Sequence, residues 1–418
     1  MSMEGCRSMD ESSIAASWCD KSLHRVWLDQ QGQRLLDFSK NAQVEQGFVA
    51  LDENGRAPKG ATAQTILTAR MTHAYALGYL RGLPGCLSLV EHGIASLTEA
   101  LYDKEHGGWL QSAADRKSRK LAYVHAFVAL AASSAFVAGI PGATILLERV
   151  LAVIEQHFWS EEEGVMRESF AFDWSDEENY RGANSNMHSV EMALAVADAL
   201  NEPVWRKRAI RIASRFVHQL ARSRGFRLVE HFDCQWQPLL DYNHDCQADD
   251  LRPYGLTPGH FLEWAHLLLN LEAALHAQGE QVPSWLLESA IGLFDSGTRL
   301  GWGVDGAPGI VYTVDWHDLP NVRNRPHWVM AEAIKAAHSL FVRTGDANYA
   351  RWYISFWDYT DRYLIDHQLG SWHNEVNDMN QPSALIYPGK ADLYHAYQAT
   401  LTPMMPLSVS LATALVRN

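Results

Sequence analysis

The chain has 418 residues, of which 47% are hydrophobic and 20% are charged, and it contains 15 tryptophans. This composition is typical of a globular protein with a large buried core and excludes an intrinsically disordered chain. The formal net charge is −14, and lysines and arginines are scattered along the sequence. Both features argue against nucleic acid or an anionic membrane as a partner.

The N-terminal segment up to Trp27 has no apolar stretch of the kind that forms a secretory signal. The longest run without Asp, Glu, Lys or Arg, residues 121–147, is broken by Gly139, Pro141 and Gly142, so we expect no membrane span. The five cysteines are irregularly spaced, which favours free thiols in a reducing compartment over a disulfide framework. We therefore expect a cytoplasmic protein that does not associate with membranes.

Short segments that combine glycine with an aromatic or apolar residue recur along the chain. They begin at Gly47, Gly108, Gly164, Gly225, Gly301 and Gly370, and successive starts lie 56 to 76 residues apart. This interval accommodates two helices with their connections. Between the segments, apolar residues recur at helical spacing, as at Leu67, Met71 and Ala74, and the run 121–137 predicts a fully buried helix.

Six helical hairpins can close into a ring of inner helices surrounded by outer helices, which leaves no apolar end exposed. The sequence therefore predicts an all-α fold, an (α/α)6 barrel, with short Gly-aromatic loops or small hairpins at one end. The stretches most like linkers, 278–283 and 305–308, are too short to separate two domains. We expect a single catalytic domain over residues 1–418.

Three predicted helix starts carry a histidine. In the first, Asn184, His188 and Glu191 fall at positions i, i+4 and i+7, so an amide, an imidazole and a carboxylate share one helix face. In the second, Thr257 is a good N-cap and Pro258 a good first helical residue. His260 then lies in the first turn, with Glu263 on its face.

The third start places Asp392, His395 and Gln398 at successive steps of three residues. A single histidine on an apolar helix is usually a packed core residue satisfied by one hydrogen bond. Three histidines at matched places in a repeat, each with a carboxylate three residues away, instead indicate acid–base chemistry, because buried charges are costly unless paired.

Other residues allow more than one interpretation. Arg70 either donates to substrate hydroxyls or forms an ordinary salt bridge, and several tryptophans, Trp316 among them, are suited to stack against a sugar ring. A zinc site would use His231, Cys234, His244 and Cys246, but their spacing matches no common zinc motif. The chain also lacks a zinc-protease motif, a phosphate loop and a dinucleotide fingerprint, so we predict chemistry without a metal or cofactor.

The segments NSNMHSVEM, RPYGLTPGHFLEWAHL, HWVMAEA and GKADLYHAYQA resemble the N-acylglucosamine 2-epimerase superfamily, and in particular its aldose–ketose isomerase branch. The resemblance runs over nearly the whole chain and implies an (α/α)6 barrel without a metal. It also implies that His260 and His395 are the proton-transfer pair. The residues it places in or beside the substrate pocket are Arg70, Tyr123, Asn184, His188, Glu263 and Glu332.

This resemblance implies an isomerase that moves a proton between C1 and C2 of an unphosphorylated monosaccharide such as mannose, through a cis-enediol. A sugar 2-epimerase and an isomerase of sulfonated sugars are the nearest alternatives. A glycoside hydrolase that uses Glu263 and Glu332, and a sugar-binding protein without activity, are more distant ones. The sequence leaves the oligomeric state open.

Overall fold

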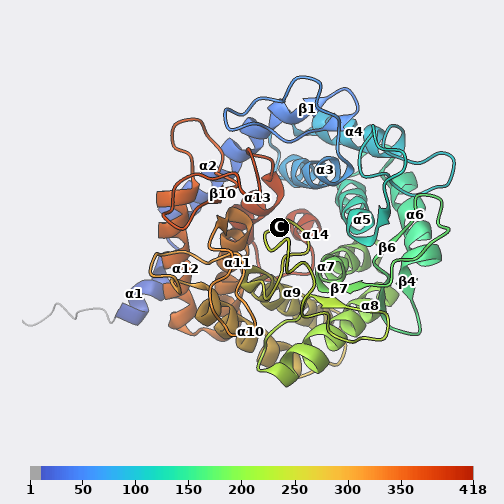
Figure 1. Cartoon of the computed structure of the whole chain (residues 1–418). Coiled ribbons are helices and arrows are strands. Elements are labelled where there is room, and N and C mark those ends of the chain that lie inside the picture. The colour runs from blue at the N-terminus through green and yellow to red at the C-terminus, as the bar shows by residue number, and fades with distance from the viewer. Residues whose placement is uncertain (1–10, 418) are drawn as a thin grey trace, which may run out of the picture.

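The structure is a computed structural model that describes residues 11–417. Two concentric rings of helices form most of it (Figure 1). The inner ring consists of α3 (Thr65–Leu80), α5 (Ala122–Val137), α7 (Ala183–Leu200), α9 (Pro258–Ala277), α11 (His327–Thr344) and α13 (Leu393–Leu401). The outer ring consists of α2 (Ser22–Ser39), α4 (Cys86–Thr98), α6 (Ala143–Val153), α8 (Pro203–Ala213), α10 (Trp285–Gly301) and α12 (Ala347–Tyr359).

The inner ring is closed. Each inner helix packs against the next one along the chain, and α13 packs against both α3 and the outer helix α2. The predicted (α/α)6 barrel is therefore confirmed. Two further helices lie outside this scheme: α1 (Glu11–Trp18) packs against α12, and α14 (Leu411–Arg417) contacts α3, α5 and α7.

The burial of each helix follows its sequence. The predicted buried helix 121–137 appears as α5, in which nearly every residue from Ala122 to Ala135 is buried. The outer helices are amphipathic, and α4 buries Leu89, Val90 and Ile94 while Leu87 is exposed. An inner helix has neighbours on all sides, whereas an outer helix has one face in solvent.

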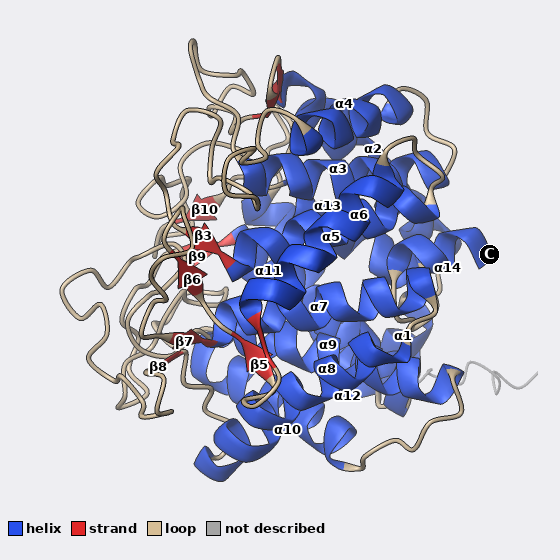
Figure 2. Cartoon of the chain, turned by 90° about the vertical axis from the view of Figure 1, so that its right-hand side faces the viewer, coloured by secondary structure: helices blue, strands red, loops and turns tan. Residues whose placement is uncertain are grey.

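The two ends of the barrel differ. Connections from an inner helix to the following outer helix are short, whereas connections from an outer helix to the next inner helix are long and gather at one end (Figure 2). Helix α14 lies at the opposite end (Figure 2). All six N-termini of the inner helices therefore point toward the layer of long loops.

Ten two-residue strands lie in the long loops: β1 (Gln43–Val44), β2 (Gly47–Phe48), β3 (Lys120–Leu121), β4 (Trp159–Ser160), β5 (Val165–Met166), β6 (Ser169–Phe170), β7 (Arg181–Gly182), β8 (His231–Phe232), β9 (Arg325–Pro326) and β10 (Glu375–Val376). They form antiparallel pairs, β1–β2, β3–β6, β4–β5, β7–β8 and β9–β10. The predicted Gly-aromatic segments lie in or at the start of these loops. Those at Gly47 and Gly164 contain β2 and β5, those at Gly108, Gly301 and Gly370 form isolated bridges through their tryptophans, and the one at Gly225 forms neither.

Backbone hydrogen bonds fix each loop to an inner helix. The first N–H groups of α3, α5, α7 and α11 donate to the carbonyl oxygens of Gln111, Glu168, Glu230 and Asn374, which all lie in the following long loop. These bonds satisfy donors that a helix N-terminus otherwise leaves without partners. Helix α9 begins at Pro258 as predicted, but the side chain of Thr257 makes no capping hydrogen bond.

Cys19, Cys86, Cys234 and Cys246 are free thiols, while Cys6 lies outside the described residues. Within residues 11–417, the structure contains no helix with the length and apolar character that a bilayer crossing requires.

Candidate active site

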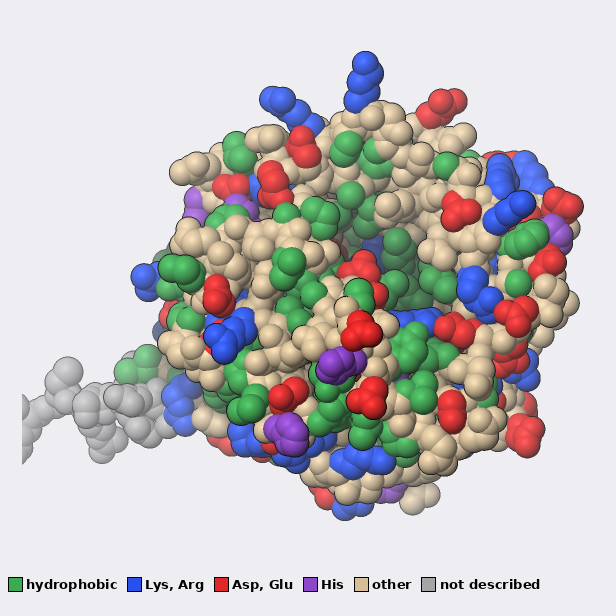
Figure 3. Space-filling view, viewed as in Figure 1, with side chains coloured by type: hydrophobic (Ala, Val, Ile, Leu, Met, Phe, Trp, Pro, Cys, Tyr) green, Lys and Arg blue, Asp and Glu red, His purple; other side chains and the backbone are tan. Residues whose placement is uncertain are grey.

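An open cavity of about 460 Å³ lies where the inner-helix N-termini meet the long loops. Figure 3 shows the hollow near the centre of this face, with acidic and apolar side chains around it. Of the sequence-predicted residues, those that line it are Arg70, Tyr123, Asn184, His188, His260, Glu263 and His395. They come from five of the inner helices, α3, α5, α7, α9 and α13.

The barrel repeat explains why these residues meet. Arg70, His188, Glu263 and Glu332 each occupy the sixth position of an inner helix. His260 and His395 occupy the third position of theirs. Because equivalent positions of packed inner helices lie at the same height, the repeat places these groups in two layers around one axis.

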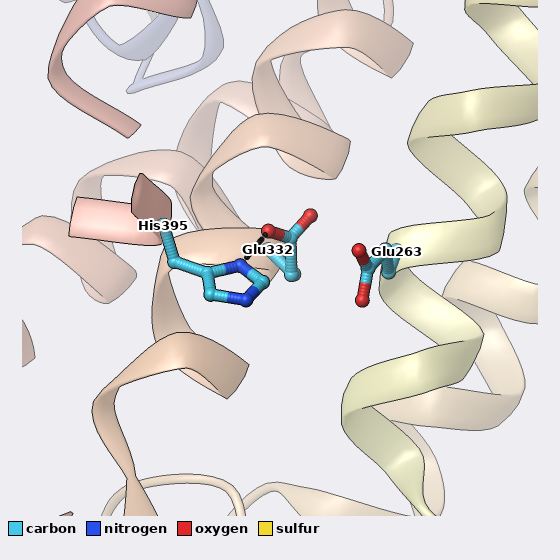
Figure 4. Close-up of side chains that lie close together, drawn as sticks. All are labelled: Glu263, Glu332 and His395. Carbon is cyan, nitrogen blue, oxygen red and sulfur yellow. Dashed lines mark hydrogen bonds and ion pairs between the residues drawn. The ribbon is translucent and has the colours of Figure 1, made fainter. Parts of the chain in front are cut away.

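Each of the two predicted catalytic histidines is held by a buried carboxylate. His395 Nδ1 lies 2.7 Å from Glu332 Oε1 (Figure 4), and His260 Nδ1 lies 2.9 Å from Glu230 Oε1. Both glutamates are almost fully buried. A neutral imidazole that donates Nδ1–H to a carboxylate has a free lone pair on Nε2, and both histidines line the cavity.

This pairing differs from the one expected along the helices. Glu263 was expected to accompany His260, but the carboxylate on His260 comes from Glu230, in the loop that leads into β8. His395 Nε2 lies 3.8 Å from Asp392 Oδ2, its predicted neighbour. The hydrogen bond of the His395 ring is made by Nδ1 with Glu332 on α11. Burial lowers the pKa of His395 well below its usual range, against the opposing charge of Asp392, so this imidazole is neutral near pH 7.

Trp328, the second residue of α11, packs against the rings of both histidines. Its ring centroid lies 5.1 Å from that of His260 and 5.9 Å from that of His395, with both pairs tilted. Trp328 lines the cavity and lies on the same helix as Glu332. The indole therefore fixes the position of both imidazoles relative to each other.

Arg70 provides a positive charge in the pocket. Its Nη2 donates to Tyr123 Oη at 2.6 Å, and its guanidinium lies 4.4 Å from the ring centroid of Phe127 and 5.1 Å from that of Tyr394. Burial opposes its charge, but the Tyr123 hydroxyl and Asp392 raise the pKa of Arg70 further above its ordinary value. The group is thus permanently charged and aimed into the cavity, where its Nε has no partner among the described residues.

His188 and Asn184 complete the lining on α7. His188 Nδ1 lies 3.5 Å from Glu191 Oε2 and 3.7 Å from Glu263 Oε1, too far for a hydrogen bond. Burial lowers the pKa of His188, against the effect of Glu191. The Asn184 side chain donates to the backbone oxygen of Leu251 at 3.1 Å, which fixes the loop over the cavity.

Glu263, Glu332 and His395 offer ligand atoms within 4.8 Å of one another, which is close enough to hold a metal ion (Figure 4). The chain already supplies a cation here, because Lys335 Nζ lies 2.8 Å from Glu332 Oε1. A divalent ion at this point would meet the ammonium group at close range. The donor set therefore fits a neutralised hydrogen-bond cluster better than a resident metal.

Two sequence-predicted residues lie outside the lining. Glu332 is fully buried behind His395 and reaches the cavity only through that imidazole. Trp316 lies in the loop after α10, and its Nε1 donates to Leu240 O at 2.8 Å. Trp316 is absent from the lining, whereas Trp328 belongs to it.

The four possible zinc ligands, His231, Cys234, His244 and Cys246, form no metal-binding cluster among the described residues. Both ring nitrogens of His231 are engaged, by Tyr180 Oη at 2.5 Å and Pro253 O at 2.8 Å. Sequence reasoning missed Glu230 as the partner of His260, and it did not single out Asp250 and Tyr387, which also line the cavity. These residues lie in loops, where no helical spacing marks them.

Comparison with known proteins extends these observations. The model of the family N-acylglucosamine 2-epimerase (GlcNAc 2-epimerase) matches residues 47–399. A D-mannose isomerase from Pseudomonas cannabina pv. alisalensis is 54% identical over 402 residues, covering 96% of this chain and 97% of its own. A D-mannose isomerase from Thermobifida fusca is 49% identical over 404 residues, covering 95% and 98%.

Solved structures agree with this assignment. A crystal structure of a D-mannose isomerase superposes with a TM-score of 0.83 and 26% identity, covering 91% of this chain and 97% of its own. The fold is shared with a cellobiose 2-epimerase from Spirochaeta thermophila, at a TM-score of 0.79 and 22% identity over 91% of this chain and 95% of that one. Fold, site and relatives together define an enzyme of the isomerase class. The chain belongs to the N-acylglucosamine 2-epimerase family.

Proposed function

We propose that this enzyme interconverts D-mannose and D-fructose by proton transfer between C2 and C1, without a metal or cofactor. The observation that carries the proposal is the pair His260 and His395, each tied through Nδ1 to a buried carboxylate and both bordering one cavity. The relatives named D-mannose isomerase support the choice of substrate.

The chemistry follows from this arrangement. In the open-chain aldose, one imidazole Nε2 takes the proton from C2 while the carbonyl oxygen on C1 gains a proton, which gives a cis-enediol. The same imidazole then delivers its proton to C1, and the hydroxyl on C2 loses its proton to become the ketone. The other imidazole moves the protons on oxygen and opens the sugar ring.

The remaining lining residues bind and orient the sugar. Arg70 donates to a sugar oxygen that gains negative charge as the enediol forms. His188 and Asn184 contact hydroxyl groups from α7, and Glu263 does so from α9. Fixing the open chain across the two imidazoles converts the proton transfers into reactions within one complex.

The charges of the cavity favour an uncharged sugar. The carboxylates of Asp115, Asp250 and Asp392 border it, whereas its cation, Arg70, is engaged by Tyr123 and aromatic rings. A phosphate or sulfonate at C6 would meet these carboxylates and be repelled. The proposed substrates are therefore unsubstituted sugars, with D-lyxose and D-xylulose as a second pair because the C1–C2 chemistry is unchanged.

The geometry gives less support to glycoside hydrolysis. An inverting hydrolase needs two carboxyl groups about 6.5–9.5 Å apart on either side of the substrate. Glu263 and Glu332 approach within 4.8 Å, and Glu332 lies buried behind His395. A 2-epimerase would use the same two imidazoles but would return the proton to the opposite face of C2.

The test is to incubate the EDTA-treated protein with D-mannose in D2O and to follow the products by proton NMR. Fructose with deuterium at C1 is expected, and D-lyxose should give D-xylulose. Glucose as the main product would replace the proposal with a 2-epimerase. Conversion of a 6-sulfonated sugar in preference to mannose would contradict the assignment of an uncharged substrate.

A further inference from the structure

A buried lysine lies beneath the pocket and takes no part in lining it. Lys335 on α11 is 3% exposed, its Nζ lies 2.8 Å from Glu332 Oε1, and it donates to Gln398 Oε1 at 3.2 Å. A lysine usually keeps its ammonium group in water, and burying one is costly unless it is paired. Burial of this ammonium inside the barrel, directly beside Glu332, therefore indicates a role in the active site.

Charged and titratable groups surround this ammonium from every inner helix that contacts it. They are Glu191 on α7, Glu263 and His266 on α9, His73 on α3, His395 on α13, and Glu332 and His338 on its own helix. Three of them, Glu191, Glu263 and Glu332, are carboxyl groups. Because three buried carboxyl groups outnumber this ammonium, one of them holds a proton.

The contacts decide which carboxyl group holds that proton. Glu332 accepts from His395 and is paired with Lys335, and Glu191 accepts hydrogen bonds from Tyr394 and Gln398. Glu263 has none of these partners. Among the described residues, Glu263 Oε2 and Glu332 Oε2 are both buried without a hydrogen bond, but Glu332 Oε1 meets both His395 and Lys335. Two ionised carboxylates this close repel each other, so the proton belongs on Glu263.

Electrostatics agrees with this geometry. Burial, and next the charge of Glu332, raise the pKa of Glu263 well above its usual range, while Lys335 acts in the opposite direction. Burial opposes the charge of Lys335, but Glu332 and Glu191 raise its pKa above the ordinary value. The ammonium group is thus retained while Glu263, which borders the cavity, is a neutral acid.

We propose that Lys335 is a positioning residue, whose ammonium keeps Glu332 ionised for His395 and leaves the shared proton on Glu263 as a hydrogen-bond donor to a sugar oxygen. The sugar contact rests on the proposed function, whereas the proton distribution does not. Without the ammonium, Glu263 loses the positive charge that lowers its pKa, so it holds its proton to higher pH.

The first test is the pH profile of kcat/KM for mannose in Lys335→Met, Lys335→Arg and Lys120→Met. Lys120 is a matched control, because it is fully buried and paired with Asp103 at 2.7 Å but does not line the cavity. Lys335→Met should shift the alkaline limb upward by about one pH unit, since a neighbouring opposite charge is worth about 1–3 units. Lys335→Arg should restore this limb.

Lys120→Met should lower the melting temperature and leave both limbs in place. A Lys335→Met enzyme with reduced activity but unmoved limbs would show that this lysine only supports the fold, and the proposal would be overturned. The same conclusion would follow if Lys335→Arg shared the shift of Lys335→Met.

The second test needs no turnover. The infrared difference spectrum of wild type minus Glu263→Gln at pH 7 should contain the carbonyl band of a protonated carboxylic acid. In the Lys335→Met background, that band should persist to higher pH. Absence of the band in wild type, or an unchanged midpoint, would contradict the proposal. If wild type failed to act on mannose, the proposed function would be wrong, and this spectrum would still decide the role of Lys335.

Discussion

At the residue scale, the site depends on which carboxylate each imidazole meets. Glu230→Gln keeps the size of the side chain that meets His260 but removes the charge that holds Nδ1–H. The amide can present an N–H to the ring instead and favour the wrong tautomer, as when a catalytic aspartate is replaced by asparagine. We expect kcat to fall about 10²–10⁴-fold with a smaller change in KM, measured by steady-state kinetics with mannose.

Glu272→Gln is the control for this substitution. Glu272 is also buried and pairs with Arg343 at 2.6 Å, but it does not line the cavity. It should lose stability and keep its kcat. Equal losses of activity in both variants would mean that Glu230 acts through the fold and not through His260.

A second residue-scale prediction separates two tryptophans. Trp328 lies against both imidazoles, whereas Trp316 holds the loop at Leu240. Trp328→Phe should lower kcat/KM at least about tenfold, because an angstrom-scale displacement of a positioned group costs up to about 10²-fold. Trp316→Phe should stay within about twofold of wild type, and the reverse order would place the sugar against Trp316.

Sequence reasoning found residues that the helix period marks and missed those that it does not. His188 and Glu263 recur at matched positions of inner helices, so spacing alone points to them. Glu230 lies in a loop 30 residues before His260, and its approach results from tertiary packing. Trp316 and Trp328 are equally aromatic in the sequence, and only the fold separates them.

At the element scale, four of the long loops accept a backbone hydrogen bond from the start of an inner helix, and the ring of loops closes on itself. The backbone N–H of Lys390, just before α13, donates to Leu51 O at 2.9 Å, in the loop before α3. The last loop is thereby fixed to the first. Periodicity predicted the helices, but it carries no information on backbone bonds between loops hundreds of residues apart.

Gly389 allows the last loop to approach the backbone of the first loop closely. Its φ is +74°, and a Cβ there would lie 2.0 Å from Leu51 O, inside the backbone of the first loop. Gly389→Ala therefore has to shift the segment that leads into α13 and His395. We expect a loss of stability of about 2–4 kcal/mol, the strain of a left-handed alanine plus the clash, and a fall in kcat. Chemical denaturation and mannose kinetics would measure both.

Gly345→Ala is the matched substitution, because Gly345 has φ +72° and a Cβ there would meet no atom within 4 Å. The Gly345→Ala variant should lose only about 1–2 kcal/mol of stability, the cost of an alanine in the left-handed conformation, and it should keep full activity. If the two alanine variants lost the same stability, the contact between Gly389 and Leu51 would contribute nothing to closing the ring.

At the scale of the whole molecule, the barrel buries many histidines in a neutral form. Burial lowers the pKa of His73 to about 4 and those of His125 and His266 to about 3. The environment of His125 shows why. Its Nδ1 donates to Leu121 O at 2.7 Å, and its Nε2 accepts from the backbone N–H of Trp109 at 3.1 Å. A second proton on the ring, at Nε2, would point at the backbone N–H of Trp109.

These histidines make the fold sensitive to acid. Below the ordinary pKa of about 6.5, the unfolded chain takes up protons that the folded barrel excludes, so stability falls as pH falls. Each such group removes up to about 1.4 kcal/mol per pH unit between pH 6.5 and its folded pKa of about 3 or 4. The melting temperature should therefore drop steeply from pH 7 to pH 5.

His125→Gln tests this at one position, because glutamine can keep hydrogen bonds but takes up no proton. The variant should be less stable than wild type at pH 7 and should lose less further stability by pH 5, since the unfolded chain then binds one proton fewer. His244→Gln provides the reference, because that side chain is 60% exposed and lies largely in solvent in the folded protein. Parallel stability–pH curves for His125→Gln and wild type would mean that His125 is protonated inside the barrel, which its contact with the Trp109 N–H forbids.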